Sequence, residues 1–351
     1  MFRTGVTQNY KLVFSKGSEG TQTYVSANYM GDEGVIDKNS YERYSAKANI
    51  KISMAKWLDV TVDLNASHGV GKGIGGLEMS GYNPLWIAFN SSPTMTMTDK
   101  NGYYNWDPYG TIQANAYGII AASESERHRD VFSGHIDLKF NIIKGLTFTS
   151  SNGVDYYNNT SYSFTPQSVN GAGKNSMGNS NLQRMLLQSS NNITYNHTWN
   201  DKHYLTVTGV WEATKSTIRN MGISGSSLQA ESVGWWDVKN AVTRDATNGY
   251  SDWALLSGVG RVIYNYDNRY MLTGTFRADG SSRFTNDKWG YFPSVAVAWT
   301  ASNESFMEST RDLISNLKIR ASYGVIGNQD IDPYSTLAIL NTTTTYFGNS
   351  S

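Results

Sequence analysis

The 351-residue sequence has no cysteine, little proline and no surplus of charge of either sign. Without cysteine it can hold no disulfide framework, no thiolate metal site and no cysteine nucleophile. The 29 basic and 29 acidic residues cancel, so the basic surplus that steers proteins to nucleic acid is missing, and we expect no nucleic-acid partner. No stretch approaches the ~18–20 consecutive apolar residues of a membrane helix, and no signal peptide follows Met1.

Glycine and the large aromatic residues are abundant instead. The chain has 33 Gly, 23 Tyr and 10 Trp, with a hydrophobic content of 39% and a mean hydropathy of −0.45. Such an average is typical of a soluble protein, but a transmembrane β-barrel has the same average because only alternate residues of its strands are apolar. Composition therefore leaves two readings open, a transmembrane barrel and a secreted all-β carbohydrate binder.

Strict alternation of apolar and polar residues is the main local pattern. It runs through 43–54, 58–67 and 132–140, and with interruptions through 205–213 and 270–278. A strand places alternate residues on one face, whereas a helix would spread the polar ones all round. Short helical turns are expected only near 84–89 and 304–313. The polar residues expected to line the lumen of a barrel are Lys47, Lys51, Asp59, Asp63, His135, Asp137, Lys139, Arg269 and Arg277.

Short and long connections alternate along the predicted strands, which are about 12–15 residues long. Tight turns are expected at 17–20, 55–56, 143–145, 200–201 and 267–268, and long loops at 31–41, 71–126, 159–182, 219–250 and 280–289. In an antiparallel meander this order places all tight turns at one end, as in outer-membrane barrels. Aromatic residues beside the tight turns predict an interfacial girdle: Trp57, Trp199, Tyr204, Tyr266, Tyr270 and Trp299.

No residue pattern predicts an enzyme, a metal site or a cofactor. Residues 71–76 match G-x-G-x-x-G, but without a following helix they are better read as the base of a flexible loop. Residues 99–102 lack the later carboxylates of a calcium loop and are read as an Asn-Gly turn. The five histidines form no metal-binding spacing. A glycan hydrolase would need a pair of catalytic carboxylates, which spacing alone does not identify.

The long loops carry many aromatic residues beside Asn and Asp. Aromatic faces next to such groups suit stacking on sugar rings or holding peptides, and large exposed aromatics are otherwise a liability. Packing of the loops on themselves is the alternative explanation. The residues predicted to contact substrate or a lid are Tyr82, Trp86, Tyr103, Tyr104, Trp106, Tyr109, Trp235 and Trp236.

A longer motif lies in residues 277–328. Its residues are Arg277, Asp279, Gly280, Ser281, Ser282, Arg283, Phe284, Phe292, Pro293, Ser294, Trp299, Leu317, Arg320, Tyr323, Gly324, Gly327 and Asn328. This run resembles the barrel of SusC/RagA-type TonB-dependent outer-membrane transporters, and weaker similarity extends over nearly the whole chain. We expect Asp279-Gly280 to form a turn with positive φ, and Pro293 to begin a strand, where no ladder donor is lost.

The resemblance implies a function and partners. Members of this family combine a plug and a larger barrel, lie in the outer membrane of Gram-negative bacteria, pair with a SusD-like surface lipoprotein and import oligosaccharides or peptides with energy from the TonB complex. Residues 1–351 are accordingly expected to be a partial barrel of about 12–13 strands in contact with outer-membrane lipid. The plug, the signal peptide and the C-terminal strands are expected to be absent, which leaves an open curved sheet or a forced small barrel. The alternative is a secreted β-rich polysaccharide-binding protein without transport activity.

Overall fold

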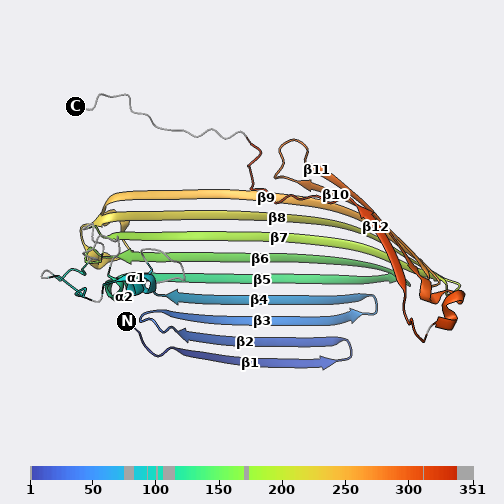
Figure 1. Cartoon of the computed structure of the whole chain (residues 1–351), viewed down its shortest axis with the longest axis horizontal. Helices are drawn as coiled ribbons and strands as arrows, with labels where there is room; N and C mark the ends of the chain where they lie inside the picture. The colour runs from blue at the N-terminus through green and yellow to red at the C-terminus, as the bar shows by residue number, and fades with distance from the viewer. Residues whose placement is uncertain are drawn as a thin grey trace. The chain divides into compact units, whose positions relative to one another are not determined.

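The computed structural model describes residues 2–74, 83–92, 94–99, 102–105, 115–169, 174–310 and 312–337. Within these ranges, twelve strands form one antiparallel sheet in which each strand pairs with its neighbours in the sequence (Figure 1). The order runs from β1 to β12, and no pairing joins the two ends of the described sheet. The predicted all-β meander is therefore confirmed, in its open form.

The elements have the following bounds. The strands are β1 Val6–Ser18, β2 Thr21–Glu33, β3 Ser40–Ala55, β4 Leu58–Lys72, β5 Glu124–Ile143, β6 Leu146–Thr165, β7 Ser176–Trp199, β8 His203–Leu228, β9 Ala241–Tyr266, β10 Tyr270–Ser281, β11 Trp289–Thr300 and β12 Lys318–Gly324. The helices are α1 Pro84–Asn90 and α2 Ala116–Ala122, with short 3₁₀ segments η1 Glu231–Val233, η2 Val238–Asn240, η3 Ala301–Asn303 and η4 Ser305–Thr310. None of these helices is long and apolar enough to cross a membrane.

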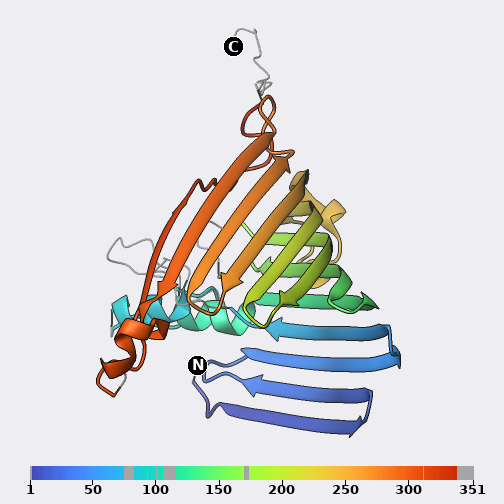
Figure 2. The ribbon, with the colours of Figure 1, turned by 90° about the vertical axis from the view of Figure 1, so that its right-hand side faces the viewer.

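The chain forms two compact units. One comprises Met1–Phe140, Ser150–Gln188 and Ser216–Ser251, and the other comprises Asn141–Thr149, Ser189–Lys215 and Asp252–Ser351. The first unit contains the β1–β2 and β3–β4 hairpins, drawn in blue in Figure 2. The second contains β10, β11 and β12, which lie side by side in the same figure.

Strand register in the first unit separates an apolar face from a polar face. Directly paired residues share a face. One row of the apolar face is Ile50–Val62–Ile136, and the adjacent row of the polar face is Lys51–Thr61–Asp137. The same register gathers the β3–β5 members of the predicted lumen set on the polar face: Lys47, Lys51, Asp59, Asp63, His135, Asp137 and Lys139. The apolar face is not covered, since Leu12 is 76% exposed, Met54 66% and Ile136 40%.

Four of the five predicted tight turns contain residues with positive backbone φ, and the turn at 55–56 does not. Gly20 and Gly145 have φ of 84°. Asn200 and Asp201 have φ of 49° and 53°, and Asp267 and Asn268 both have 53°. Paired positive-φ residues turn the chain with the twist of the flanking strands, and Asn and Asp tolerate this conformation well. One connection departs from the predicted pattern, because β11 and β12 are joined by residues 301–317, which contain η3 and η4 where the helical turn near 304–313 was expected.

Two predicted loops are largely strand. The loops expected at 159–182 and 219–250 shrink to 166–175 and 229–240, because β5 to β9 are 20 to 26 residues long. The extra length comes from segments such as Asn158–Tyr162, where polar residues occupy both faces. Alternation of hydrophobicity signals a strand only where one face is apolar, so these extensions carry no such signal.

Only two small apolar clusters are buried in the described part of the first unit. One joins α1, α2 and the β6–β7 connection through Ile87, Ala116, Ile119 and Val169. The other joins Phe164, Met177, Leu228 and Ala241 beneath the β8–β9 connection. Most large apolar side chains of the strands lie on an exposed sheet face instead, the reverse of the burial expected for a water-soluble domain.

Candidate functional site

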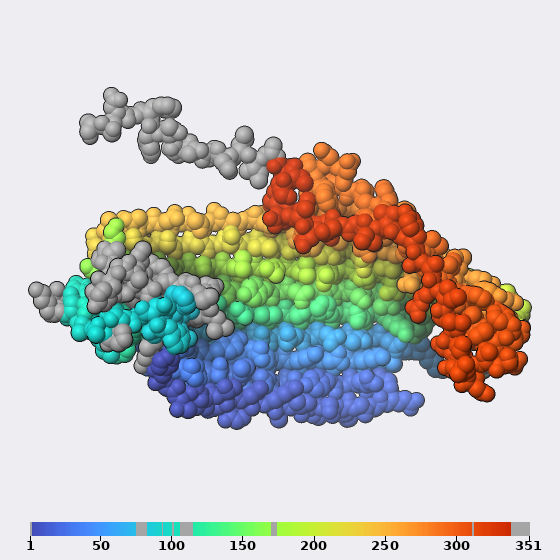
Figure 3. All heavy atoms as spheres, viewed as in Figure 1, coloured from blue at the N-terminus to red at the C-terminus, as the bar shows by residue number. Residues whose placement is uncertain are grey.

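The described residues of the β4–β5 connection pack together with residues 166–169, and we call this part the loop assembly (residues 83–92, 94–99, 102–105 and 115–122 with 166–169). Asn83 caps α1 by accepting hydrogen bonds from the amides of Leu85 at 2.9 Å and Trp86 at 3.4 Å. Asn115 caps α2 by accepting from the Gly118 amide at 3.0 Å. Figure 1 shows both helices at the end of β4 and β5 opposite the β3–β4 turn, and Figure 3 shows cyan atoms of this connection at the same end. The caps and the buried cluster give this connection a defined surface.

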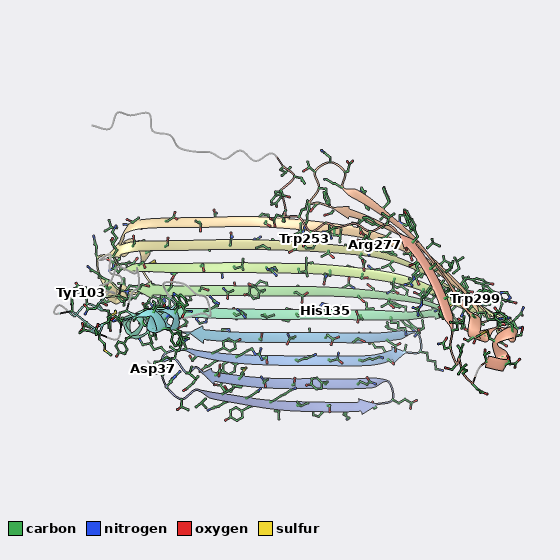
Figure 4. The ribbon with its side chains drawn as sticks, viewed as in Figure 1. Asp37, Tyr103, His135, Trp253, Arg277 and Trp299 are labelled. Atoms are coloured by element: carbon green, nitrogen blue, oxygen red, sulfur yellow. The ribbon has the colours of Figure 1, made fainter. Side chains whose placement is uncertain are left out.

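Some predicted aromatic contact residues lie on that surface and one does not. Trp86 is exposed, as is Tyr103, which Figure 4 labels, and Phe89 of α1 is 84% exposed. Tyr104 is half-buried against Tyr117 and the α2 backbone, with ring centroids 6.2 Å apart, so its role in the assembly is packing. The remaining predictions in this loop lie outside the described residues: Tyr82, Trp106 and Tyr109.

Two hydrogen bonds agree with the turn expected at 99–102, of which Lys100 and Asn101 lie outside the described residues. The Gly102 amide donates to the Asp99 carbonyl at 3.2 Å, and the Tyr103 amide donates to the Asp99 carboxylate at 2.9 Å. An Asx-type contact of this kind closes a turn by itself and needs no bound ion.

Trp235 and Trp236 form a separate aromatic cluster. Tyr162 stacks on Trp235 at 5.9 Å and lies 5.8 Å from Trp236, which is 77% exposed. On its other side Tyr162 meets the edge of His128 at 5.9 Å. His128 is paired with Val70, whose row belongs to the apolar face of β3 and β4. The two tryptophans therefore lie on the side of the sheet that carries the apolar face, and not on the side of the polar face.

A cleft of about 590 Å³ lies beside this cluster, and we call it the wall cleft. Its lining includes three basic residues, Arg3, Lys38 and Lys72. It also includes five acidic residues, Asp32, Glu33, Glu42, Glu124 and Glu126, together with Trp235. Two charge pairs lie within it, Arg3–Glu33 and Lys72–Glu126, both at 3.5 Å. The indole nitrogen of Trp235 is buried without a hydrogen-bond partner. Sequence reasoning missed this cleft, because its residues come from five strands, three connections and the segment before β1.

The polar face carries hydrogen-bonded side chains across the strands. Asn49 donates to Asp63, and Ser53 donates to Asp59 at 2.6 Å. His135, labelled on β5 in Figure 4, lies 3.9 Å from Asp155 of β6. Such cross-strand polar contacts stabilise a sheet face exposed to water. The polar face thus has the character of a hydrated lumen wall.

The second unit holds its own charged cluster around Arg277 of β10. The guanidinium donates to Asp279 at 2.8 Å and to Ser257 at 3.1 Å, and it lies 3.7 Å from Glu212. Arg269, the other basic residue predicted for the lumen, lies instead in the β9–β10 turn. It bridges Asp267 at 2.5 Å and Glu304 at 3.1 Å.

Arg283 connects several residues of the sequence motif. Its side chain donates to the carbonyls of Gln329 at 3.2 Å and Ile331 at 2.8 Å, and its charge lies 4.6 Å from the ring centroid of Trp253. Gly327 leaves room for the Phe292 ring, which an added Cβ would approach to 2.3 Å. The motif therefore fastens residues 327–331 to β9 beside Trp253, to the segment that follows β10 and to β11, and Figure 4 labels Trp253 and Arg277 in this region.

The remaining motif residues mostly serve the backbone. Ser282 accepts from the Ala254 amide at 2.8 Å, Ser281 accepts from the Arg283 amide at 3.3 Å, and Asn328 accepts from the Asp330 amide at 2.8 Å. The Phe284 amide donates to the Ser281 carbonyl at 3.5 Å, and the Ser302 amide donates to the Leu317 carbonyl at 3.3 Å. Ser294 pairs with Gly324 in the β11–β12 ladder, while Tyr323 and Arg320 are exposed. The motif thus encodes strand ends and their connections.

Two predicted backbone roles in the motif are wrong. Gly280 has no positive φ: it is a strand residue paired with Trp289, whose ring an added Cβ would approach to 2.9 Å, so the glycine makes room for the indole. Pro293 lies inside β11 and does not begin it. Its carbonyl accepts from Val325 at 3.0 Å, so its nitrogen faces β12, where pairing starts only at Ser294. The missing donor breaks no ladder bond there.

Glu304 organises the β11–β12 connection. It accepts a hydrogen bond from Trp299 at 3.0 Å and from Arg269 at 3.1 Å. Hydrogen bonding holds the pKa of the Glu304 carboxyl below its usual value, with the largest effect from the Tyr270 hydroxyl and smaller effects from Trp299 and Arg269. Donors to a carboxylate stabilise its charged form. Trp299, predicted for the girdle, is thereby tied to the turn beside it.

Nothing in this geometry identifies a reactive centre. No group of three or more His, Asp or Glu side chains is placed to hold a metal ion among the residues that the structure describes. The charged clusters at Arg277 and Glu304 are internally paired. What the surfaces offer is aromatic contact, hydrogen bonding and charge, which suit binding.

The curated proteins that the chain resembles carry the same name, TonB-dependent receptor. A scan of protein-family models finds no match. The chain is 28% identical over 346 residues to TonB-dependent receptor P3 of Formosa agariphila, covering 96% of the chain and 34% of that receptor. It is 26% identical over 370 residues to TonB-dependent receptor SusC of Bacteroides thetaiotaomicron, covering 94% of the chain and 34% of SusC.

The fold has a counterpart among solved structures. The chain superposes on a structure of the RagAB peptide transporter with a TM-score of 0.75 and 24% identity, covering 98% of this chain and 39% of that one. The named relatives are receptors and a transporter. The chain spans about a third of the length of the curated relatives it matches.

Proposed function

The chain belongs to the SusC/RagA-type TonB-dependent receptors, and from that premise we propose that it forms part of the wall of an outer-membrane importer. The observation that carries the proposal is the separation of the faces. On β3 to β5 the apolar face is exposed, and the polar face carries the charged residues. A barrel wall between lipid and a hydrated lumen needs this arrangement, whereas a soluble polysaccharide binder would bury its apolar face.

The length of the apolar face supports a membrane position. From Tyr44 to Met54 on β3, ten steps of about 3.3 Å give roughly 33 Å along the strand. At a tilt of about 40° this length covers roughly 25 Å of membrane thickness, the height of the apolar band of outer-membrane barrels. Aromatic residues mark both limits, with the Tyr10–Tyr29–Tyr44 row at one and Trp57 stacked on Phe140 at the other. The tight turns beside Trp57 then face the periplasm.

The loop assembly then faces the outside, where we propose that it meets the imported molecule or a SusD-like lipoprotein lid. Its exposed Trp86, Phe89 and Tyr103 stand on a packed base, so the contact surface is formed before binding. Oligosaccharides or peptides are the proposed substrates. Trp236 lies on the apolar-face side of the wall and suits contact with a partner protein better than contact with a molecule in the lumen.

Import and binding without transport are distinguished by uptake measurements. Cells that carry the intact receptor should accumulate labelled oligosaccharide or peptide only when TonB and the proton motive force are present. Replacement of both Trp86 and Phe89 by Ala should lower uptake by about tenfold or more, because hot-spot aromatics carry most contact energy. Replacement of Trp57, at the opposite end of the strands, serves as the control. Substrate that binds to the surface equally with and without TonB, and is never accumulated, would support the secreted-binder alternative.

A further inference from the structure

Two hollows lie next to each other on the apolar face of β1–β5, one apolar and one polar. The polar one is the wall cleft. The other is an open groove of about 860 Å³, which we call the apolar groove. Both belong to the first unit, and the row of tyrosines separates them. We propose that together they bind one glycolipid of the outer leaflet, with an acyl chain in the groove and the sugar head group in the cleft.

The apolar groove follows from the strand register. Ala27, Ala46 and Ala66 are directly paired and form its floor. One row towards the cleft, Tyr29 and Tyr44 rise beside that floor, with ring centroids 5.1 Å apart. A floor of methyl groups beside tall aromatic rings gives a channel that a flexible hydrocarbon chain can enter. A second protein wall would meet the tyrosine rings first and leave the channel empty, so we commit to a lipid chain.

The wall cleft has the groups that bind a sugar. Trp235 lines it, and an aromatic ring offers an apolar face on which the C–H face of a sugar ring can pack. The five carboxylates outnumber the three basic groups, which disfavours a purely anionic phosphate head group. Neutral hydroxyl groups can donate to the carboxylates and accept from Arg3 and the lysines.

The spacing of the two hollows suits one amphipathic molecule. Glu42 of the cleft and Ala46 of the groove are four residues apart on the same face of β3, about 13 Å along the strand. Tyr44 lies between them, at the expected level of the membrane surface. The cleft therefore lies on the aqueous side and the groove on the hydrocarbon side. This inference rests on the proposed membrane position of β3, which the labelling of cysteines introduced one at a time along that strand tests separately.

The test is lipid binding to the intact receptor in nanodiscs, measured by native mass spectrometry. The probes are a monoglucosyl diacylglycerol, phosphatidylcholine with the same acyl chains, and free methyl glucoside. We expect retention of the glycolipid at about tenfold lower concentration than phosphatidylcholine, and no displacement by methyl glucoside at equal concentration. The tenfold preference corresponds to about 1.4 kcal/mol, the size of one or two net hydrogen bonds.

Paired variants separate the two halves of the site. Ala46→Phe fills the groove, whereas Ala48→Phe lies on the same strand and face, one row outside the groove lining. Glu42→Gln changes the cleft, whereas Glu19→Gln lies in the β1–β2 turn. Ala46→Phe should weaken binding of both lipids by about tenfold, and Glu42→Gln should remove most of the preference for the sugar head group. The two controls should bind as the parent does.

Three results would overturn the proposal. The first is equal retention of glycolipid and phosphatidylcholine. The second is an equal effect of Ala46→Phe and Ala48→Phe. The third is a dimer of receptors whose interface excludes the lipid at this face. If the parent receptor shows no uptake but still prefers the glycolipid, the transport proposal is wrong and the proposed lipid site stands.

Discussion

A charge placed in the middle of the apolar face should destabilise the barrel strongly. Ile136 pairs with Val62, which in turn pairs with Ile50. Ile50 is the sixth of the ten residue steps from Tyr44 to Met54, so this row of side chains lies near the middle of the apolar band. The side chain is 40% exposed, so Ile136→Arg removes little packing. Arginine at the membrane midplane of a barrel costs about 2–4 kcal/mol, which lowers the folding equilibrium by roughly 30- to 900-fold.

The assay is urea unfolding of the intact receptor in phospholipid vesicles, followed by the shift of its folded band in electrophoresis. Thr61→Arg provides the matched control, because Thr61 lies at the same depth on the polar face, opposite Asp137. Met54→Arg lies at the edge of the band and should cost no more than about 1 kcal/mol. The reasoning is refuted if Ile136→Arg changes stability by less than about 0.5 kcal/mol, as an ordinary surface substitution does.

Three further substitutions test particular contacts. The pKa of Glu304 is lowered, so its stabilisation of the β11–β12 connection should be complete above pH ~5. This stabilisation should be lost as the pH falls below the ordinary glutamate pKa of about 4.3. Hydrogen exchange of the connection should show this loss, and Glu304→Gln should abolish the pH dependence. Arg283→Lys cannot reproduce the forked contacts with two carbonyls, so proteolysis within 327–337 should accelerate while β3 stays protected. Gly118→Ala brings a methyl group to 2.4 Å from the Tyr104 ring and should loosen the loop assembly by about 1–3 kcal/mol; unchanged protection of α2 would contradict this.

The sequence predicted those strands in which one face is apolar. Residues 43–54 alternate without interruption, and the register of β3 with its neighbours gathers their charged side chains on one face as expected. The alternation of apolar and polar residues no longer marks strands beyond the level of the Tyr10–Tyr29–Tyr44 row. There both faces are polar, and β6 to β9 continue as strands. There the backbone pairing is maintained by neighbouring strands, which no local window of sequence contains.

The candidate surfaces were predictable only in part. Aromatic content indicated the loop at 82–109, but the burial of Tyr104 depends on contacts with α2, which follows it in the chain. Trp235 and Trp236 were expected with the other loop aromatics, and their place beside Tyr162 depends on strand extensions that the sequence did not reveal. Gly280 and Pro293 were read as local turn and strand-start signals, although their partners Trp289 and Val325 lie in later segments.

Thiol labelling of β3 tests the central claim most directly. The chain has no cysteine, so each introduced thiol is the only one in it. Cysteine replaces, one at a time, Lys47, Asn49 and Lys51 on the polar face and Ala48, Ile50 and Ile52 on the apolar face. In outer membranes, a water-soluble maleimide should label the first set and leave the second unlabelled, because the thiolate is the reactive form and a thiol in hydrocarbon stays protonated. Equal labelling of both sets by the water-soluble reagent would contradict a strand that separates lipid from lumen.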